Sequence, residues 1–510
     1  MESLARGPIQ DAMTDALARH GGRRAMVGGA ESLTYEELGG RIEAAARRLR
    51  ESLPAAPGEA PRHVGFCLGN RPEYVVLYFA TLYAGHLPLL LDANFNTGEI
   101  ESIRGDCGLD ALVIESARVE GLAAVGNVGN NEPVAFADGV VLLPLARPGA
   151  TPFAPRPATQ VCRFTSGSTG RPKCLEFSGD AVVSAARNWI LGTGMTGADR
   201  TLCLAALSNG LAFNTSLLST FLAGGELHFL KGVPLTRPVA NRIVEAGITR
   251  LVAFPTLYRN FVAPGGPDRS AMASLRHAIS AGAPLWPDVR EEFRARYGLD
   301  ISDYYGIAET GPCTFERHAD HHAGLGEPLP GVEIRIAPGE DGTDGEDAGE
   351  VLVRTSSMAS GYLNHPGMFE ARLDADGFYH SGDRGRIVGG RLHLVGRTQD
   401  HINVAGRKID PTEIVAVVSA LDGVADAVAF PDEDLNREAL VHLVVVAARE
   451  DAREELTRAE ITAACRSRLA PYKVPGRISF IAEIPRTGIG KPRIAMLREQ
   501  LNATAKGTVG

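Results

Sequence analysis

A chain of 510 residues is longer than one hydrophobic core ordinarily uses, so we expect two or more domains. The 52 basic and 61 acidic residues give a net charge of −9 without a long basic run, which argues against nucleic acid as the main partner. The seven cysteines are scattered and none is spaced C-x-x-C, which predicts reduced thiols. The sequence shows no apolar leader and no apolar run near the ~20 residues of a membrane span, so we expect a soluble cytoplasmic protein.

The first half of the chain alternates between helical and strand-like patterns. Residues 34–52 predict an amphipathic helix, because Thr34 and Glu37 stand at the spacing of a capping box. Residues 72–84 return to helical spacing. Short apolar runs predict buried strands at 64–69, 86–91, 201–207, 226–230, 250–255 and 277–282. This alternation indicates mainly parallel sheets with helices on their faces, and therefore an α/β fold.

The chain changes character after residues 337–350, an acidic and Gly-rich stretch that predicts an exposed turn. Short strands from Gly349 to about Val404, beginning with 351–354, predict a small β-rich layer. Candidate strands at 425–430 and 440–447 and a helix near 457–469 then form a compact α+β unit. We place the domain boundary at 399/400. Residues 1–399 are expected to form a large N-terminal domain of layered α/β subdomains, and residues 400–510 a small C-terminal domain.

The stretch TSGSTGRPK, residues 165–173, has the composition of a phosphate-binding loop. Its glycines allow tight turns, its hydroxyls donate hydrogen bonds, and Arg171 and Lys173 supply positive charge. It differs from the G-x-x-x-x-G-K-[ST] loop, because Arg171 and Pro172 separate Gly170 from Lys173, and Ser168 is not in a G-x-S-x-G elbow. Taken alone, it also fits a surface turn. As a nucleotide polyphosphate site, its contacts would be Thr165, Ser166, Gly167, Ser168, Thr169, Gly170 and Lys173.

Four further motifs follow in order: YGIAET at 305–310, YHSGD at 379–383, GR at 396–397 before INVAGRKI at 402–409, and PRTGIGK at 485–491. With the loop at 165–173, they resemble the adenylate-forming superfamily of acyl-CoA synthetases, peptide-synthetase adenylation domains and luciferases. The resemblance extends from about residue 25 to about residue 497 and is closest to acyl-CoA synthetases. It implies an ATP-dependent acid–thiol ligase that forms an acyl-adenylate, releases pyrophosphate and transfers the acyl group to coenzyme A, leaving AMP.

The resemblance also implies an ATP site. Attack of a carboxylate on the α-phosphate needs positioning and charge neutralisation, and Mg²⁺ suits this task because it prefers oxygen ligands. Glu309 is implied to be a catalytic carboxylate that holds this ion, Asp383 to accept hydrogen bonds from the ribose, and Arg397 to add a cation near ribose and phosphate. The remaining implied ATP or AMP contacts are Gly282, Ala283, Pro284, Asp303, Tyr304, Tyr305, Gly306, Ala308, Thr310 and Lys408.

Lys491 is implied to be the catalytic lysine, which bridges the substrate carboxylate and the α-phosphate during adenylation. Without the preceding PRTGIG, a lysine at this position would be expected to face solvent. The resemblance implies that the small domain is mobile and rotates about a hinge at Gln399 and Asp400. Lys491 would then serve the first half-reaction, and the face carrying Gly406 would open the path for coenzyme A in the second.

Three positions depart from the usual family pattern. The hinge position is commonly Asp or Lys and here is Gln399, while Asn403 stands where many members have Lys. Acetyl-CoA synthetases also carry Asn in a run similar to INVAGRKI, so thiol transfer remains the expectation. Cys174 replaces the Gly that usually follows the loop lysine, and we expect this small residue to preserve the loop.

The same resemblance places the acid pocket at Asn209, Phe213, Phe254, Ala281 and Ile307. Amino-acid-activating members carry an Asp near the position of Leu211, so an α-amino acid is disfavoured. The pocket is expected to be mainly apolar and not narrowed by a Trp. These features favour a hydrophobic organic acid over acetate and leave its chain length and ring structure open.

Two alternative functions remain open. A standalone adenylating enzyme that loads a carrier protein or another nucleophile would need the same ATP site, although no fused carrier is expected because a pantetheine attachment sequence such as G-x-x-S-L is absent from the last part of the chain. A non-catalytic ligand sensor is disfavoured, since Lys173, Glu309, Asp383 and Lys491 are all retained. The HADHH run, with His318, His321 and His322, fits a solvated loop better than a metal site.

Overall fold

The computed structural model divides the chain into two compact units. The first comprises Met1–Ala93, Ile103–Thr165 and Lys173–Thr398, and the second comprises the remaining residues, among them Asn94–Ser102. The residues described by the structure are 6–29, 31–54, 60–122, 125, 132–137, 139–146, 153–165, 172–230, 234–282, 285–317, 324–337, 348–397, 402–404, 407–434, 437–447, 457–485, 492 and 494–507.

A nine-stranded sheet forms the larger scaffold of the first unit. In spatial order its strands are β16 (Glu327–Pro328), β15 (Gly311–Phe315), β14 (Ile301–Ile307), β13 (His277–Ser280), β12 (Arg250–Ala253), β10 (Arg200–Cys203), β11 (Glu226–Phe229), β1 (Arg24–Gly28) and β2 (Glu31–Thr34). The pairs from β14 through β1 are all parallel, and the strands beyond them are antiparallel. The carboxyl ends of the parallel strands therefore share one edge of the sheet.

An eight-stranded sheet forms the second layer of this unit. Its strands, in spatial order, are β19 (Gly361–Tyr362), β9 (Lys173–Ser178), β8 (Thr159–Thr165), β4 (Leu87–Leu90), β3 (His63–Cys67), β5 (Ala111–Glu115), β7 (Val140–Pro144) and β6 (Val134–Ala137). The central pairs are parallel, whereas β8 and β9 form an antiparallel hairpin. A smaller antiparallel sheet contains β17 (Val332–Ala337), β18 (Gly349–Thr355), β20 (Tyr379–Val388) and β21 (Arg391–Arg397).

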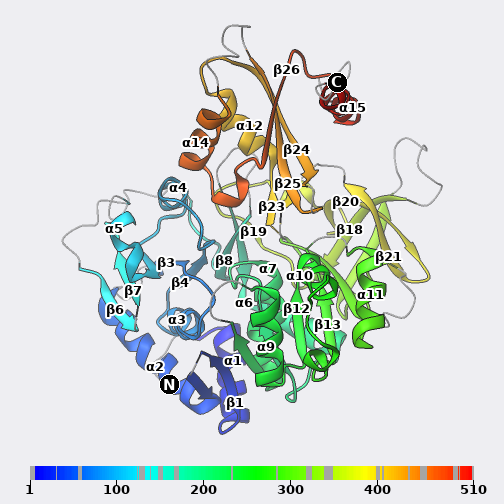
Figure 1. Cartoon of the computed structure of the whole chain (residues 1–510). Coiled ribbons are helices and arrows are strands. Elements are labelled where there is room, and N and C mark those ends of the chain that lie inside the picture. The colour runs from blue at the N-terminus through cyan, green and yellow to red at the C-terminus, as the bar shows by residue number, and fades with distance from the viewer. Residues whose placement is uncertain are drawn as a thin grey trace. The chain divides into compact units, whose positions relative to one another are not determined.

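Helices cover these sheets because each buries one apolar face against them. Figure 1 shows α9, α10 and α11 gathered around β12 and β13, where Ile243, Phe261 and Phe293 belong to one buried cluster with Leu251. Thr34 caps α2 through the expected capping box with Glu37. The helices of the first unit are α1 (Pro8–His20), α2 (Tyr35–Ser52), α3 (Pro72–Tyr83), α4 (Thr97–Cys107, which extends into both units), α5 (Val119–Leu122), α6 (Gly179–Thr193), α7 (Gly210–Ala212), α8 (Leu218–Ala223), α9 (Thr236–Ala246), α10 (Pro255–Val262) and α11 (Pro287–Tyr297).

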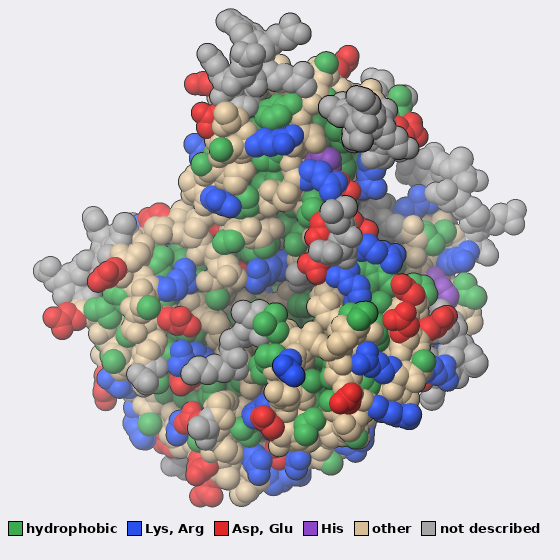
Figure 2. All heavy atoms as spheres, in the orientation of Figure 1, with side chains coloured by type: hydrophobic (Ala, Val, Ile, Leu, Met, Phe, Trp, Pro, Cys, Tyr) green, Lys and Arg blue, Asp and Glu red, His purple; other side chains and the backbone are tan. Residues whose placement is uncertain are grey.

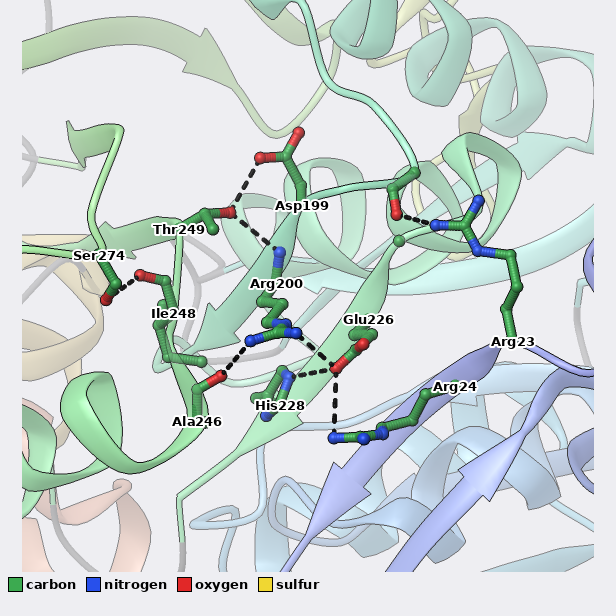
Figure 3. A network of polar contacts seen from close by, with 12 residues as sticks. Arg23, Arg24, Asp199, Arg200, Glu226, His228, Ala246, Ile248, Thr249 and Ser274 are labelled. Carbon is green, nitrogen blue, oxygen red and sulfur yellow. Dashed lines mark hydrogen bonds and ion pairs between the residues drawn. The ribbon is translucent and has the colours of Figure 1, made fainter.

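A polar network ties together the amino ends of the parallel strands. Glu226 on β11 contacts Arg24 on β1 and Arg200 on β10, and Thr249 donates a hydrogen bond to Asp199 over 2.9 Å (Figure 3). Asp199 also pairs with Arg250, the first residue of β12, at 3.8 Å. These charges neutralise one another, so the charged residues at this end of the sheet have a structural role.

The second unit has its own sheet and core. Its strands β24 (Val424–Glu433), β25 (Ala439–Ala447) and β26 (Arg477–Ile481) form one sheet, and β22 (Ile402–Val404) pairs with β23 (Arg407–Ile409). Ile414 and Ile461 bury the inner faces of α12 (Pro411–Ser419) and α14 (Arg458–Arg468) in one apolar cluster with Leu443. The last helix is α15 (Ile494–Gly507).

The predicted α/β class with a large N-terminal part, a small β-rich layer and a small α+β C-terminal part is confirmed. The predicted strands and the helices at 34–52 and 72–84 are all present, and β24, β25 and α14 match the expected C-terminal elements. All seven cysteines are buried free thiols. The predicted turn at 337–350 lies mostly outside the described residues, and the boundary at 399/400 stays a prediction.

The mixed charge of the sequence is visible on the surface of the described residues. Lys and Arg side chains intermingle with Asp and Glu over the face of the molecule shown in Figure 2. Within the ranges that the structure describes, every helix is too short or too polar to cross a membrane.

Candidate active site

The shared carboxyl edge of the nine-stranded sheet gathers several of the predicted site residues. Phe254 follows β12, Ala281 and Gly282 follow β13, and the YGIAET motif begins on β14. Ser280 is paired in register with Asp303, so the ends of β13 and β14 lie side by side. Gly282 has a φ of 85°, a left-handed conformation that glycine adopts without steric cost. Ligands of open α/β sheets characteristically bind at such an edge.

The turn that follows β14 presents Glu309. Tyr362 on β19 donates a hydrogen bond from its hydroxyl to Oε1 of Glu309 over 2.7 Å. Burial and the nearby carboxylate raise the pKa of Tyr362 far above its usual value, so the phenol stays protonated and acts as the donor. The buried Thr310 follows directly, and its backbone carbonyl accepts a hydrogen bond from Ser357 over 2.8 Å.

Asp383 lies on β20 and reaches the same motif from the small sheet. The hydroxyl of Tyr305 donates to Oδ2 of Asp383 over 2.7 Å, and both side chains are buried. Burial, followed by the charge of Asp383, raises the pKa of Tyr305 well above its ordinary value. Glu350 fixes the part of β20 next to Asp383 by accepting hydrogen bonds from the backbone N–H of Gly382 and from His380. Two predicted nucleotide-contacting residues are thus directly connected.

Asp303 is engaged inside the protein. Its carboxylate pairs with Arg290 on α11, and Arg290 also contacts Glu316 at 3.0 Å. Burial raises the pKa of Asp303 to about 7, in opposition to the favourable charge of Arg290. A direct contact between this carboxylate and the adenine would have to compete with Arg290. The nucleotide contact assigned to Asp303 stays a prediction. Tyr304 is buried beside it, with its ring packed edge-on against Trp189.

Thr165 and Lys173 are paired across the β8–β9 hairpin, which leads into the predicted phosphate loop and out of it. Both side chains are partly exposed. Cys174 is buried directly after Lys173, and its backbone N–H donates to the side-chain oxygen of Asn364 over 2.8 Å. Burial raises the pKa of the Cys174 thiol, so it packs as a small neutral side chain.

The predicted acid-pocket residues come from three neighbouring segments. Asn209 caps α7 by accepting a hydrogen bond from Leu211 N–H over 2.8 Å. Phe213 begins a π-helical turn, Phe213–Leu217, that continues into α8. Ala281 and Ile307 are buried after β13 and at the end of β14, whereas Phe254 is only partly buried. Insertions of this helical kind are frequent at functional sites.

Several predicted residues lie outside the described residues. These are Ser166, Gly167, Ser168, Thr169, Gly170, Ala283, Pro284, Gln399, Asp400, Gly406 and Lys491, the side chains of Arg397 and Lys408, and His318, His321 and His322. Their assigned roles stay predictions. Gly306 is described, and its backbone approaches Gly311 so closely that an added Cβ would lie 2.5 Å from the carbonyl oxygen of Gly311.

Two residues of this region did not emerge from the sequence. Tyr362 holds Glu309, but the GY pair that contains it carries no local signal for that contact. Arg163 is buried on β8 beside Phe213, and a basic residue within the apolar strand run VCRF is a signal that could have identified it.

The chemistry of these residues fits Mg²⁺ together with a nucleotide. Mg²⁺ usually binds one or two carboxylates plus phosphate oxygens and water, and Glu309 offers one carboxylate that Tyr362 orients. Among the described residues, no group of three or more His, Cys, Asp and Glu side chains could form an all-protein cage for a metal.

Comparison with known proteins identifies the family. The AMP-binding enzyme family matches residues 13–363, and the AMP-binding enzyme C-terminal domain matches residues 413–491. Because the first match alone covers more than half of the sequence, the chain belongs to the AMP-binding enzyme family. The predicted adenylate-forming superfamily is thereby confirmed.

Individual relatives cover nearly the whole chain. The 3-hydroxybenzoate–CoA/4-hydroxybenzoate–CoA ligase of Thauera aromatica is 27% identical over 95% of this chain and 95% of its own. A feruloyl-CoA synthase of Amycolatopsis sp is 28% identical over 93% of each chain. Among solved structures, a malonyl-CoA ligase with methylmalonyl-CoA and AMP bound is 27% identical, with a TM-score of 0.77 over 92% of this chain and 99% of that one.

Proposed function

We propose that this chain activates a hydrophobic, aromatic carboxylic acid as its acyl-adenylate and transfers the acyl group to coenzyme A. The acid–thiol ligase reaction and its use of ATP and coenzyme A, which the motifs predict, are confirmed by the family and by relatives that are CoA ligases. Aromaticity is the added element of the proposal. The hydroxybenzoate–CoA ligase and the feruloyl-CoA synthase carry the name of an aromatic acid, unlike the malonyl-CoA ligase, and apolar side chains predominate among the expected pocket residues.

The observation that carries the proposal is the convergence of Asp383 and Tyr362 on the motif Tyr305–Thr310, where they contact Tyr305 and Glu309. In the first half-reaction a carboxylate oxygen of the acid attacks the α-phosphate of ATP, and the bond to pyrophosphate breaks. Asp383, oriented by Tyr305, would accept from the ribose hydroxyls and fix the nucleotide. Glu309, oriented by Tyr362, would hold Mg²⁺, which neutralises charge on the phosphates when it is bound.

The second half-reaction needs a different arrangement around the acyl-adenylate. The thiol of coenzyme A attacks the acyl carbon, AMP leaves, and the thiol proton passes to a base or to solvent. We assign Lys491 to the first step alone and the face of Gly406 to the thiol path. Rotation at Gln399 and Asp400 would exchange the two. These four assignments rest on the motif order of the sequence.

The test is product analysis by mass spectrometry after incubation with ATP, Mg²⁺, coenzyme A and a panel of aromatic, aliphatic and short-chain acids. We expect AMP and an aryl-CoA, with acetate a poor substrate. Acyl-adenylate that accumulates in the presence of coenzyme A, and that is consumed only when a carrier protein or an amine is supplied, would favour the alternative of a standalone adenylating enzyme. Equal turnover of acetate and aromatic acids would reject the aromatic assignment.

The variant Lys491→Ala separates the half-reactions. We expect it to abolish most acyl-adenylate formation while a synthetic acyl-adenylate is still converted to the thioester, because the lysine is assigned to the first step only. Equal loss of both steps in a folded variant would show that Lys491 has another role.

A further inference from the structure

Arg163 places a cation in the interior beside the expected acid pocket. Its side chain projects from β8 and is only 4% exposed. The guanidinium carbon lies 4.1 Å from the ring centre of Phe177 and 5.1 Å from that of Phe213. Aromatic faces attract such a cation and satisfy its planar surfaces, but they leave the N–H groups at its edge in need of acceptors.

The described residues offer few acceptors to this edge. Nη2 donates to the carbonyl oxygen of Ala308 over 3.3 Å, whereas Nε has no hydrogen-bond partner among them. No described carboxylate forms an ion pair with Arg163, in contrast to the buried Arg250 and Arg290. Burial lowers the pKa of Arg163 to about 10, so the group is still protonated at neutral pH. A buried charge without a close counterion costs several kcal/mol as an order of magnitude.

The free edge of the guanidinium is directed to the segment that is expected to line the acid pocket. A Cβ added to Gly210 would lie 2.6 Å from Nη1 of Arg163 and 3.8 Å from Nδ2 of Asn214, so glycine at this position leaves room for both polar groups. Asn214 is 6% exposed and follows Phe213 in the π-helical turn. Arg163 therefore adds charged hydrogen-bond donors to this segment, beside the amide of Asn214.

We propose that Arg163 is a specificity-determining residue, which donates hydrogen bonds to a second oxygen acceptor on the substrate acid, remote from the carboxylate that is activated. The inference rests on the proposed function, because it refines the class of acid that the same site takes. The acceptor is a hydroxyl or a second carboxylate, since either oxygen matches the fork of donors and the positive charge. Acids without such a group would leave the buried donors unpaired.

The test compares benzoate, 3- and 4-hydroxybenzoate and benzene-1,4-dicarboxylate by ATP–pyrophosphate exchange. The wild-type enzyme should show kcat/KM at least about 10-fold higher for one of the substituted acids than for benzoate, because a charge-assisted hydrogen bond of about 1.5–3 kcal/mol corresponds to such a factor. A preference for a hydroxybenzoate would identify a hydroxyl as the acceptor, and a preference for benzene-1,4-dicarboxylate would identify a carboxylate. If benzoate is used as well as every substituted acid, the inference is wrong even though the proposed function holds. If no aromatic acid supports exchange, the proposed function itself fails.

Variants then assign the preference to the residue. Arg163→Met should lower kcat/KM for the preferred substituted acid much more than for benzoate, and so remove most of the discrimination, and Arg163→Lys should restore part of it. Arg250→Met is the matched control, because it removes another buried arginine, which lies at the amino end of β12. It should leave the preference for substituted acids intact. A uniform loss for all acids in Arg163→Met would overturn the inference and make Arg163 a support for the turn at Ala308. Should Arg163→Met be insoluble, Arg163→Lys and the wild-type preference decide the matter.

Discussion

The hydroxyl of Tyr305 on β14 donates a 2.7 Å hydrogen bond to the carboxylate of Asp383 on β20, although 78 residues separate them in the chain. The bond links the large parallel sheet to the small antiparallel sheet at the point where the family motifs meet. It gives the predicted ribose-binding role of Asp383 a physical basis, because a carboxylate with a fixed orientation loses less rotational freedom when it binds a ligand.

Removal of this bond is expected to weaken nucleotide binding. Tyr305→Phe should raise the KM for ATP by about 10-fold or more, because hydrogen bonds to charged groups contribute about 1.5–3 kcal/mol. The measurement is pyrophosphate exchange against ATP concentration in Tyr305→Phe, Asp383→Asn and the double variant. The single effects should not add, since both changes interrupt one interaction. Additive effects would mean that the two residues act independently.

The pair of Tyr362 and Glu309 is expected to govern the Mg²⁺ dependence. Glu309→Gln should shift half-maximal pyrophosphate exchange to higher Mg²⁺ concentration, because the amide lacks the charge of the carboxylate. Tyr362→Phe should shift it in the same direction but less, since the carboxylate remains and only its orientation is lost. Tyr258→Phe is the control, as it removes a buried hydroxyl that donates to the backbone carbonyl of Ile279 instead. An unchanged Mg²⁺ dependence in Glu309→Gln would remove that residue from the ion site.

His86 is expected to make the fold sensitive to mild acid. Its ring is buried, and neither nitrogen has a hydrogen-bond partner among the described residues. Burial, followed by the charges of Arg62 and Arg50, lowers the pKa of His86 to about 4. In the unfolded chain His86 takes up a proton near pH 6.5, whereas in the folded chain it does so only near pH 4. The free energy of unfolding is therefore highest above pH 6.5 and falls by up to about 3 kcal/mol as the pH is lowered towards 4. Urea unfolding of the wild type and His86→Leu at pH 7.5 and pH 5 checks this, and equal losses in both proteins would contradict it.

Lys473 is expected to be important for the stability of the second unit. It is 1% exposed and pairs with Glu413 at 2.8 Å and with Glu99 at 3.0 Å. Burial opposes its charge, but the carboxylates outweigh this effect and raise the pKa of Lys473 above the usual lysine value. Lys473→Met would leave two buried carboxylates without a counterion, and we expect a loss of about 3–5 kcal/mol in urea unfolding at pH 7.5. Arg354→Met, which interrupts an exposed pair with Glu333, should change stability little.

The sequence by itself determined the local structure and the family. The capping box of Thr34 and Glu37 and the short apolar runs predicted α2 and the strands because their signals are contained within a few neighbouring residues. The ordered motifs indicated an adenylate-forming ligase for the same reason, since each motif is contiguous.

Only the tertiary structure decided which residues contact the predicted site residues. The two residues of each contact are separated by about fifty residues or more in the chain. The contacts are Tyr305 with Asp383, Tyr362 with Glu309, and Arg163 with Phe213. Their pairing depends on the order and register of strands in three sheets, which no periodicity within a single segment encodes. The ion pair between Asp303 and Arg290 also depends on the tertiary structure. Packing of β14 against α11 buries the carboxylate of Asp303, and an unpaired buried carboxylate would destabilise the fold.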